Sequence, residues 1–325
     1  MRVRSKWCAV LVTATVVAGA LAAAPAGAAP PAGPTLVDSV TGATGAQARA
    51  GAAQFQQGVA RTATGRAVDG PAAAAEVLRY WTPERMRAAE TADTGVLAAT
   101  PFPTSRTIGK VFFVDPNRGN RDSACSAAVL HTAKGKLVLT AGHCVHGGGT
   151  GRQYMTQWMF SPGHNGGDPV GRFTAVAFTT YTLWLTNGNS GYDVAVAELL
   201  PLGGASVVAA VGGGNGLAIN YGVGHPVTAV GYPALGGFAT NKVQQACAGT
   251  TFQFGPLQVG ISNCDFTGGA SGGPWFLTYN QATGSGHIYS VSGNILDRVL
   301  PGEVFGAYFD DTTYAMVSYA EYYSA

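Results

Sequence analysis

The stretch TGGASGGPWFLTY, residues 267–279, decides the fold class of this chain. It surrounds Ser271 with glycines and continues from Pro274 as an apolar, strand-like run. Glycines allow a tight turn and let successive N–H groups point at one spot, as the stabilisation of an oxyanion requires. The stretch therefore predicts a nucleophilic serine on a sharp turn before a strand. A plain glycine-rich turn is the alternative.

The letters GASGG, residues 269–273, also match the G-x-S-x-G nucleophile elbow of the α/β-hydrolases. Three features disagree with that fold. The elbow serine leads into a helix, whereas WFLTY is strand-like. The only later histidine is His287, which lies very near the serine. Strands and helices do not alternate along the chain, so an all-β fold is favoured.

Short strand-like runs, separated by clusters of Gly, Asn, Pro and Asp, follow one another from about residue 107. One series, from KVFFV to DVAVAEL, precedes the segment 201–204, and a second, from PVTAVGYP to HIYSVSGNI, follows it. Such series are typical of barrels or a sandwich. We expect two barrels with a boundary near 201–204, and a short helix over 312–323 at the C-terminus.

A histidine and an aspartate precede the serine. His143 lies in TAGHC, and Asp193 opens the alternating run DVAVAEL. A serine needs a base to become nucleophilic, and an imidazole needs a carboxylate to fix its tautomer. A carboxylate at the start of a buried strand is unfavourable unless it is paired. Taken alone, His143 fits a packed side chain and Asp193 a turn residue. Together with Ser271 they predict a His–Asp–Ser triad.

The first 29 residues have the pattern of a secretory signal peptide, with a basic start, an apolar run and the small residues Ala26-Gly27-Ala28. A membrane anchor is the alternative, but the run is short for a span of roughly 20 residues. We expect a secreted, extracellular protein.

Cleavage of that segment removes Cys8 and leaves an even number of cysteines, which in an exported chain indicates disulfides. The sequence-local pairing is Cys125–Cys144 with Cys247–Cys264, and two other pairings exist. The chain has no C-x₂-C pair of the kind found in zinc sites. We expect no metal and no cofactor; calcium at the loop residues Asp297, Asp310 and Asp311 is the alternative, although they form no recognised site.

The composition excludes two classes of partner. The net charge is +2, charged residues make up 11% of the chain, and Lys and Arg do not cluster, so we expect no binding to nucleic acid. After the signal peptide no stretch is long and apolar enough to span a membrane, so we expect no membrane partner.

Residues 30–106 differ in composition from the rest. They are rich in Ala, Gly, Gln, Thr and Arg, with a helix signal in RYWTPERMRAAE, residues 79–90. There Thr82 suits a helix cap and Pro83 the first helical position. The segment is too sparse in apolar residues to build a core of its own. We interpret it as a pro-segment, with a disordered linker as the alternative.

The blocks TAGHC, YDVAVAEL and GGASGGPW resemble the active-site blocks of chymotrypsin-fold serine peptidases. In particular they are similar to the secreted trypsin-like peptidases of actinobacteria, a group related to the glutamyl endopeptidases. The similarity covers roughly Thr107 to the C-terminus. It implies two six-stranded antiparallel β-barrels, with the active site in the cleft between them, in a peptidase domain at 107–325.

The resemblance also implies the role of each residue. His143 would be the general base, Asp193 would orient it, and Ser271 would attack the carbonyl of a protein or peptide substrate. The backbone N–H groups of Gly269 and Ser271 would hold the oxyanion. Cys125–Cys144 would fix the histidine loop, and Cys247–Cys264 the loop that enters the serine block. We expect a monomer, with its own pro-segment as partner.

Two departures from the family pattern bear on control and specificity. Ala270 replaces the aspartate that pairs with a freed N-terminus in many animal relatives, so any zymogen control must come from the pro-segment. The expected wall strand, residues 290–294, lacks the histidine of glutamate-specific enzymes. Asp265 is a candidate for the S1 pocket, where it would attract Lys or Arg; a surface turn residue is the alternative.

Two further readings of the chain stay open: a binding module built on the same fold, and an enzyme that hydrolyses small esters. Fold alone does not prove a peptidase.

Overall fold

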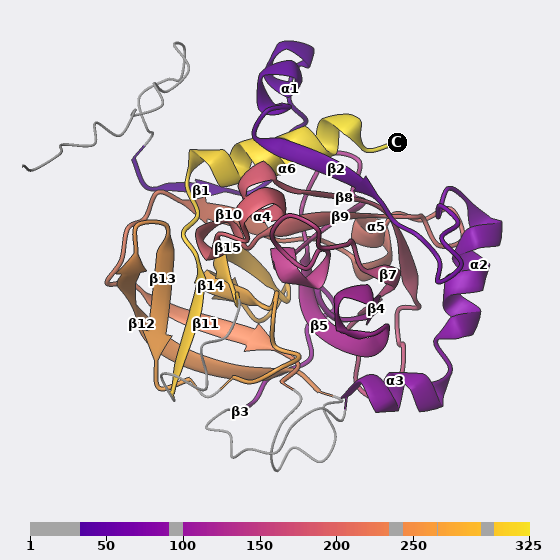
Figure 1. The fold of residues 1–325 in the computed structure, drawn as a ribbon. Helices are drawn as coiled ribbons and strands as arrows, with labels where there is room; N and C mark the ends of the chain where they lie inside the picture. The colour runs from indigo at the N-terminus through magenta and orange to yellow at the C-terminus, as the bar shows by residue number, and fades with distance from the viewer. Residues whose placement is uncertain (1–32, 91–99, 234–242, 265, 294–301) are drawn as a thin grey trace, which may run out of the picture. The chain divides into compact units, whose positions relative to one another are not determined.

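The computed structural model describes residues 33–90, 100–233, 243–264, 266–293 and 302–325, shown as a ribbon in Figure 1. The predicted signal peptide, residues 1–29, lies outside the described residues. No helix of the described part of the chain is long and apolar enough to cross a membrane.

The first sheet closes into a six-stranded antiparallel barrel, as predicted. Its strands pair in the order β8-β7-β4-β5-β6-β9, and pairing of β8 with β9 closes the ring. They are β4 (Ile108–Asp115), β5 (Arg121–Val129), β6 (Leu137–Thr140), β7 (Thr156–Pro162), β8 (Phe173–Tyr181) and β9 (Ala195–Leu199). Every residue of β4, β6 and β9 is buried, because side chains fill the inside of a small barrel and other elements cover its outside.

The second sheet contains the strands of the second predicted series, in the order β1-β10-β15-β14-β11-β12-β13-β16, with β3 (Thr100–Pro101) paired to β12. They are β1 (Thr35–Val37), β10 (Gly216–Ile219), β11 (Pro226–Gly231), β12 (Gln245–Gly255), β13 (Gln258–Ser262), β14 (Pro274–Asn280), β15 (Ser285–Val291) and β16 (Glu303–Ala307). Between β15 and β16 the described residues hold the isolated bridge Ser292–Gly306 and no ladder. The structure therefore shows a second sheet, and a closed second barrel is not shown.

Short helices connect the strands. They are η1 (Pro116–Arg118), η2 (Gly142–Cys144), α4 (Thr182–Asn187), η3 (Ser190–Tyr192) and α5 (Val207–Val211). The predicted C-terminal helix is α6 (Asp311–Tyr323), which begins where the Asp310 side chain accepts from the N–H groups of Thr312 and Thr313. The apolar residues that follow the Ser271 turn from Pro274 form strand β14, as their pattern predicts.

Residues 33–90 form β1, α1 (Gly45–Gly51), β2 (Phe55–Val59), α2 (Pro71–Tyr80) and α3 (Pro83–Glu90). β1 pairs with β10 of the second sheet, and β2 pairs with β8 of the barrel. The predicted helix at 79–90 is divided at Trp81 and Thr82, and α3 begins at Pro83, with the Thr82 hydroxyl accepting from the N–H of Arg85. A disordered linker does not describe these residues.

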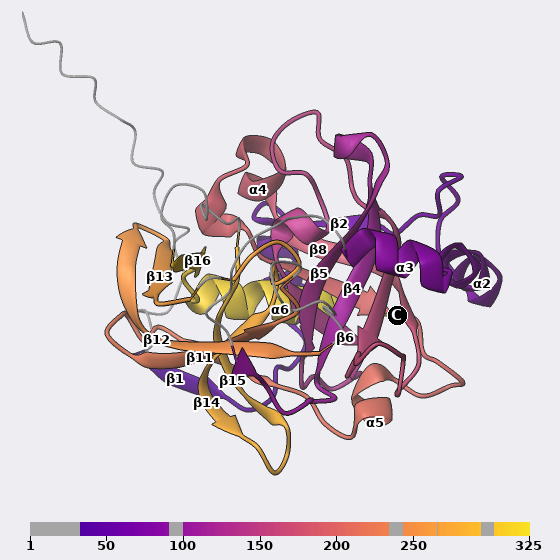
Figure 2. The ribbon, with the colours of Figure 1, turned by 90° about the horizontal axis from the view of Figure 1, so that it is seen from below.

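The segment supplies apolar side chains to the cores of the two sheets. Ala73, Val77 and Trp81 join the cluster that contains Phe112 of the barrel. α2 packs against β7 and α3 against β5, and both helices lie along the side of the barrel in Figure 2. The composition correctly indicates too little apolar surface for a separate core, but it does not show where these few side chains are buried.

Trp81 is the largest fully buried side chain of this segment. It is 1% exposed, and its indole N–H donates to the carbonyl of Gln157 at 2.6 Å. Next to it, the Tyr80 hydroxyl donates to Asp122, which also pairs with Arg85 at 2.8 Å. Burial and the Asp122 hydrogen bond raise the pKa of Tyr80 to about 12, so the hydroxyl remains a donor at neutral pH.

We expect Trp81→Ala to lower the free energy of unfolding by about 3–5 kcal/mol, because it leaves a cavity the size of an indole in the barrel core. Urea denaturation followed by circular dichroism measures the change. Leu36→Ala, at a side chain of the same segment that is 42% exposed, is the control and should change stability by about 0.5 kcal/mol or less. Equal losses for the two variants would show that Trp81 is not an anchor.

Candidate active site

His143 lies in the η2 turn, directly after β6 ends at Thr140. Its Nδ1 lies 2.8 Å from one carboxylate oxygen of Asp193, and its backbone N–H donates to the other at 2.7 Å. An ionised carboxylate only accepts hydrogen bonds, so Nδ1 carries the proton of this contact. In the neutral ring Nε2 is then the unprotonated nitrogen, which is the form that a general base requires.

Asp193 is fully buried between η3 and β9. The η3 turn that precedes it begins at Asn189, whose side chain accepts from the N–H of Gly191. A side chain at Gly142 would lie 3.0 Å from both the Asp193 carboxylate and the Trp184 indole nitrogen, so a larger residue would require these neighbours to shift by a few tenths of an ångström. Asp193 is thus both buried and paired.

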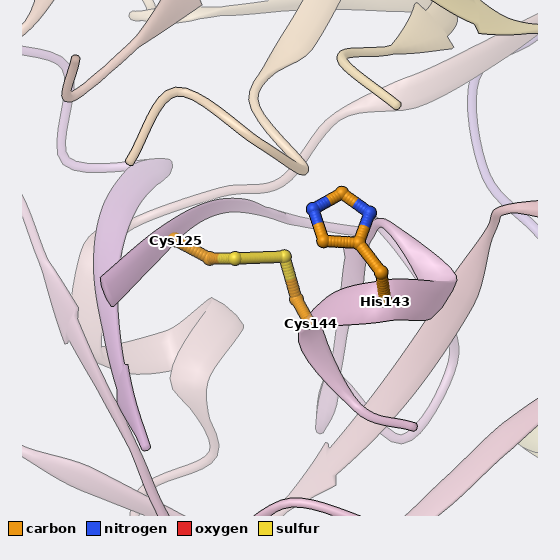
Figure 3. Close-up of side chains that lie close together, drawn as sticks. All are labelled: Cys125, His143 and Cys144. Atoms are coloured by element: carbon orange, nitrogen blue, oxygen red, sulfur yellow. A yellow bond between two sulfur atoms is a disulfide. The ribbon is translucent and has the colours of Figure 1, made fainter. Parts of the chain in front are cut away.

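A disulfide between Cys125 of β5 and Cys144 of η2 lies beside the imidazole, as Figure 3 shows. The ligand atoms of Cys125, His143 and Cys144 lie within 4.8 Å of one another. The two sulfurs are bonded to each other and are not thiolates, so this group does not have the donors of a zinc site. The sequence-local pairing is confirmed here and at Cys247–Cys264.

Ser271 lies on the turn before β14 and is 6% exposed. Its carbonyl accepts from the N–H of Ser126 at 2.7 Å, next to the Cys125 disulfide. The turn is close to the end of β6, since a side chain at Gly272 would lie 2.1 Å from the Thr140 hydroxyl. The structure thus places Ser271 against the histidine loop. Among the described residues, no hydrogen bond joins the Ser271 hydroxyl to His143.

The two predicted oxyanion donors have no competing acceptor in the part of the chain that the structure describes. Among the described residues, the N–H groups of Gly269 and Ser271 meet no acceptor. The N–H of Ala270, between them, donates to the carbonyl of Thr267 at 3.1 Å. Gly269 has a φ of +92°, a conformation that glycine adopts readily.

Ser292 holds the far side of the turn and was missed from the sequence. Its carbonyl accepts from the N–H of Gly272 at 2.7 Å, and its N–H donates to the carbonyl of Gly273 at 2.9 Å. Its hydroxyl accepts from the indole N–H of Trp275 at 3.0 Å. The only sequence signal was its place in the expected wall strand, 290–294.

The described part of this expected wall strand, residues 290–293, reaches the Asp193 carboxylate at Gly293. A side chain at Gly293 would lie 3.5 Å from Asp193, and the Ser290 hydroxyl donates to the carbonyl of Ala307 at 2.7 Å. Asn294 and the S1 candidate Asp265 lie outside the described residues.

His146, two residues after the end of η2, is a packed side chain with both ring nitrogens hydrogen-bonded. Its Nε2 donates to the carbonyl of Arg152 at 2.9 Å, and its Nδ1 accepts from the N–H of Gly148 at 3.1 Å. Burial lowers the pKa of His146, which keeps the ring neutral.

Comparison with known proteins agrees with this geometry. Residues 125–284 match the profile of the trypsin-like peptidase domain. The thermostable serine protease AL20 from an extremophilic microorganism is 34% identical, with a TM-score of 0.60, over 68% of this chain and 99% of that one. Protease Anisep from Arthrobacter nicotinovorans is 30% identical, with the same TM-score and the same coverage.

A Glu endopeptidase has a TM-score of 0.53 over 70% of this chain and 97% of its own, but at 19% identity the likeness is one of fold alone. A search of curated proteins gave no match. AL20 and Anisep, at 34% and 30% identity, match this chain along almost their whole length. The chain belongs to the trypsin-like serine peptidases.

Proposed function

We propose that the protein is a secreted serine endopeptidase in which Ser271 forms an acyl-enzyme, His143 is the general base and Asp193 orients it. Membership of the family makes the protein a peptidase that acts on protein or peptide substrates. The observation that carries the assignment of residues is the pair of the buried Asp193 and the partly exposed His143, next to a serine turn that hydrogen-bonds to the barrel.

In the proposed reaction, His143 Nε2 takes the proton of the Ser271 hydroxyl as its oxygen attacks the substrate carbonyl. The imidazolium that forms lies against the Asp193 carboxylate, whose negative charge stabilises it. His143 then donates that proton to the leaving amine, and water repeats the sequence to release the acid. Catalytic hydrogen bonds are often long in a free enzyme and tighten when substrate binds. We therefore expect the hydrogen bond between the Ser271 hydroxyl and His143 Nε2 to form in the complex with substrate.

The N–H groups of Gly269 and Ser271 would receive the negative charge that develops on the substrate oxygen. Two free N–H donors directed at that oxygen lower the activation barrier, because their hydrogen bonds to it strengthen as negative charge develops in the transition state. Their lack of other acceptors among the described residues supports this role. We propose that the site lies in a cleft between two barrels. In this proposal strands β15 and β16 complete the second barrel, and the boundary between the barrels lies near 201–204.

We further propose a signal peptide at 1–29, a pro-segment at 30–106 and a monomeric peptidase domain at 107–325. The two disulfides support export, because such bonds persist in oxidising compartments. Arg106, at the end of the expected pro-segment, is exposed, but its neighbours Ser105 and Thr107 are buried, so a cut there requires local opening of the chain. Since β1 and β2 pair with the two sheets, a cleaved segment would remain bound to the domain.

For specificity we propose that Asp265 lies in the S1 pocket and favours Lys or Arg at P1. The absence of a histidine from residues 290–294 supports a preference other than glutamate. Profiling against a peptide library tests this assignment, and cleavage after acidic or aromatic residues would contradict it.

Ser271→Ala should lower kcat by about 10⁶-fold on a peptide substrate and abolish labelling by a fluorophosphonate probe, because the nucleophile is lost. Ser123→Ala, a substitution in β5 at a partly exposed serine, is the control and should cleave and label like the wild type. A Ser271→Ala protein that still cleaves casein at the wild-type rate would disprove the proposal. A wild type that neither cleaves nor labels would favour a binding module.

Asp193→Asn should lower kcat by about 10⁴-fold with a much smaller change in KM, because the amide would favour the wrong tautomer of His143. Steady-state kinetics on a chromogenic peptide measures both constants. A fall in kcat of less than about tenfold would mean that Asp193 is not the orienting carboxylate.

The fragment that contains Trp81 should co-elute with the peptidase domain in native gel filtration after maturation, and separate from it in denaturant. We expect this because β2 of the segment pairs with β8 of the barrel and the Trp81 indole is buried in the barrel core. N-terminal sequencing of both fragments locates the cut, which we expect near Thr107. A domain that elutes without the fragment would show that the segment dissociates.

A further inference from the structure

Ser126 of β5 connects the barrel to the serine turn through two hydrogen bonds. It is fully buried. Its N–H donates to the carbonyl of Ser271 at 2.7 Å, and its hydroxyl donates to the carbonyl of Gly269 at 2.8 Å. Ser126 thus donates hydrogen bonds to the carbonyls of both residues that flank Ala270.

The direction of the Ser126 hydroxyl is set by its neighbours. The oxygen accepts from the N–H of Tyr232 at 2.9 Å, and this N–H can only donate. The hydroxyl hydrogen is therefore left for the carbonyl of Gly269. A second hydroxyl, that of Thr140, donates to the carbonyl of Ser126 at 2.8 Å and fixes the residue from the β6 side.

The turn needs this external restraint because its glycines leave the backbone free to rotate. The peptide between Gly269 and Ala270 is bonded at both ends, to the Ser126 hydroxyl and to the carbonyl of Thr267. The peptide between Ser271 and Gly272 is likewise bonded to the Ser126 N–H and to the carbonyl of Ser292. Neither peptide can rotate without breaking two hydrogen bonds.

With these two peptides fixed, the N–H groups of Gly269 and Ser271 are the ones between Gly269 and Gly273 that have no acceptor among the described residues. We propose that the Ser126 hydroxyl is a positioning residue for the oxyanion hole: by holding the carbonyl of Gly269, it keeps both N–H groups directed at the substrate oxygen. The inference rests on the proposed function and adds a residue that does not itself touch the substrate.

Ser126→Ala removes the hydroxyl and keeps the N–H that bonds to Ser271. We expect kcat on a peptide amide to fall by about 10- to 100-fold, because an oxyanion donor contributes about 10²- to 10³-fold and is here displaced, not removed. KM should change by less than about threefold. Affinity for a peptide aldehyde, whose adduct carries the oxyanion, should fall by the same factor as kcat/KM.

Thr132→Val is the matched control. It removes another buried hydroxyl, which accepts from the N–H of Gly135 in the turn after β5. It should lower stability without changing kcat or the affinity for the aldehyde. A purely structural role for Ser126 would give the same result in Ser126→Ala and would overturn the inference.

Where Ser126→Ala does not fold, Ser126→Thr is compared with Ser126→Val, because these side chains have the same shape and differ in the hydroxyl. Ser126→Thr should have the higher kcat, and equal values would overturn the inference. Fluorophosphonate labelling of the wild type is measured first and tests the proposed function alone. An unlabelled wild type overturns that function and this inference with it, whereas a labelled wild type with an unchanged Ser126→Ala overturns only the inference.

Discussion

A buried carboxylate must be paired, and the arrangement of the site depends on how Asp193 meets this requirement. Both of its oxygens are bonded to one residue, the backbone and the ring of His143. This contact fixes the η2 turn relative to β9, and the disulfide at Cys144 connects the same turn to β5. The serine turn is bonded to β5 at the residue after the cysteine. The orientation of the His143 imidazole and the position of Ser271 therefore depend on one short stretch of the barrel.

The parts of the site that the sequence could predict are those that lie in short local blocks. His143, Asp193 and Ser271 each stand in a recognisable stretch, and their order distinguishes this fold from an α/β-hydrolase. Two pairs of cysteines near each other in sequence indicated the disulfides that the structure shows. The first barrel and the C-terminal helix could be predicted from the spacing of apolar residues. Alternation of apolar and polar residues in a strand, and helical spacing in a helix, depend only on residues near one another in sequence.

Contacts between distant segments could not be predicted in this way. The Ser126 hydroxyl meets the carbonyl of Gly269, which is 143 residues away, and a single serine in a strand gives no signal of such a contact. The same limit applies to Trp81, whose indole reaches the carbonyl of Gln157, 76 residues along the chain. The sequence shows that residues 30–106 have few apolar side chains. It does not show that those few are inserted one by one into the cores of other elements.

The pairing of the N-terminal strands has a consequence for association between copies of the protein. An exposed sheet edge presents unpaired N–H and C=O groups and is a template for pairing with another chain. β1 covers the edge of β10, and β2 covers the part of β8 that β7 leaves unpaired. Residues 33–59 therefore shield one edge in each sheet, so a domain stripped of them would expose two strands to edge-to-edge aggregation.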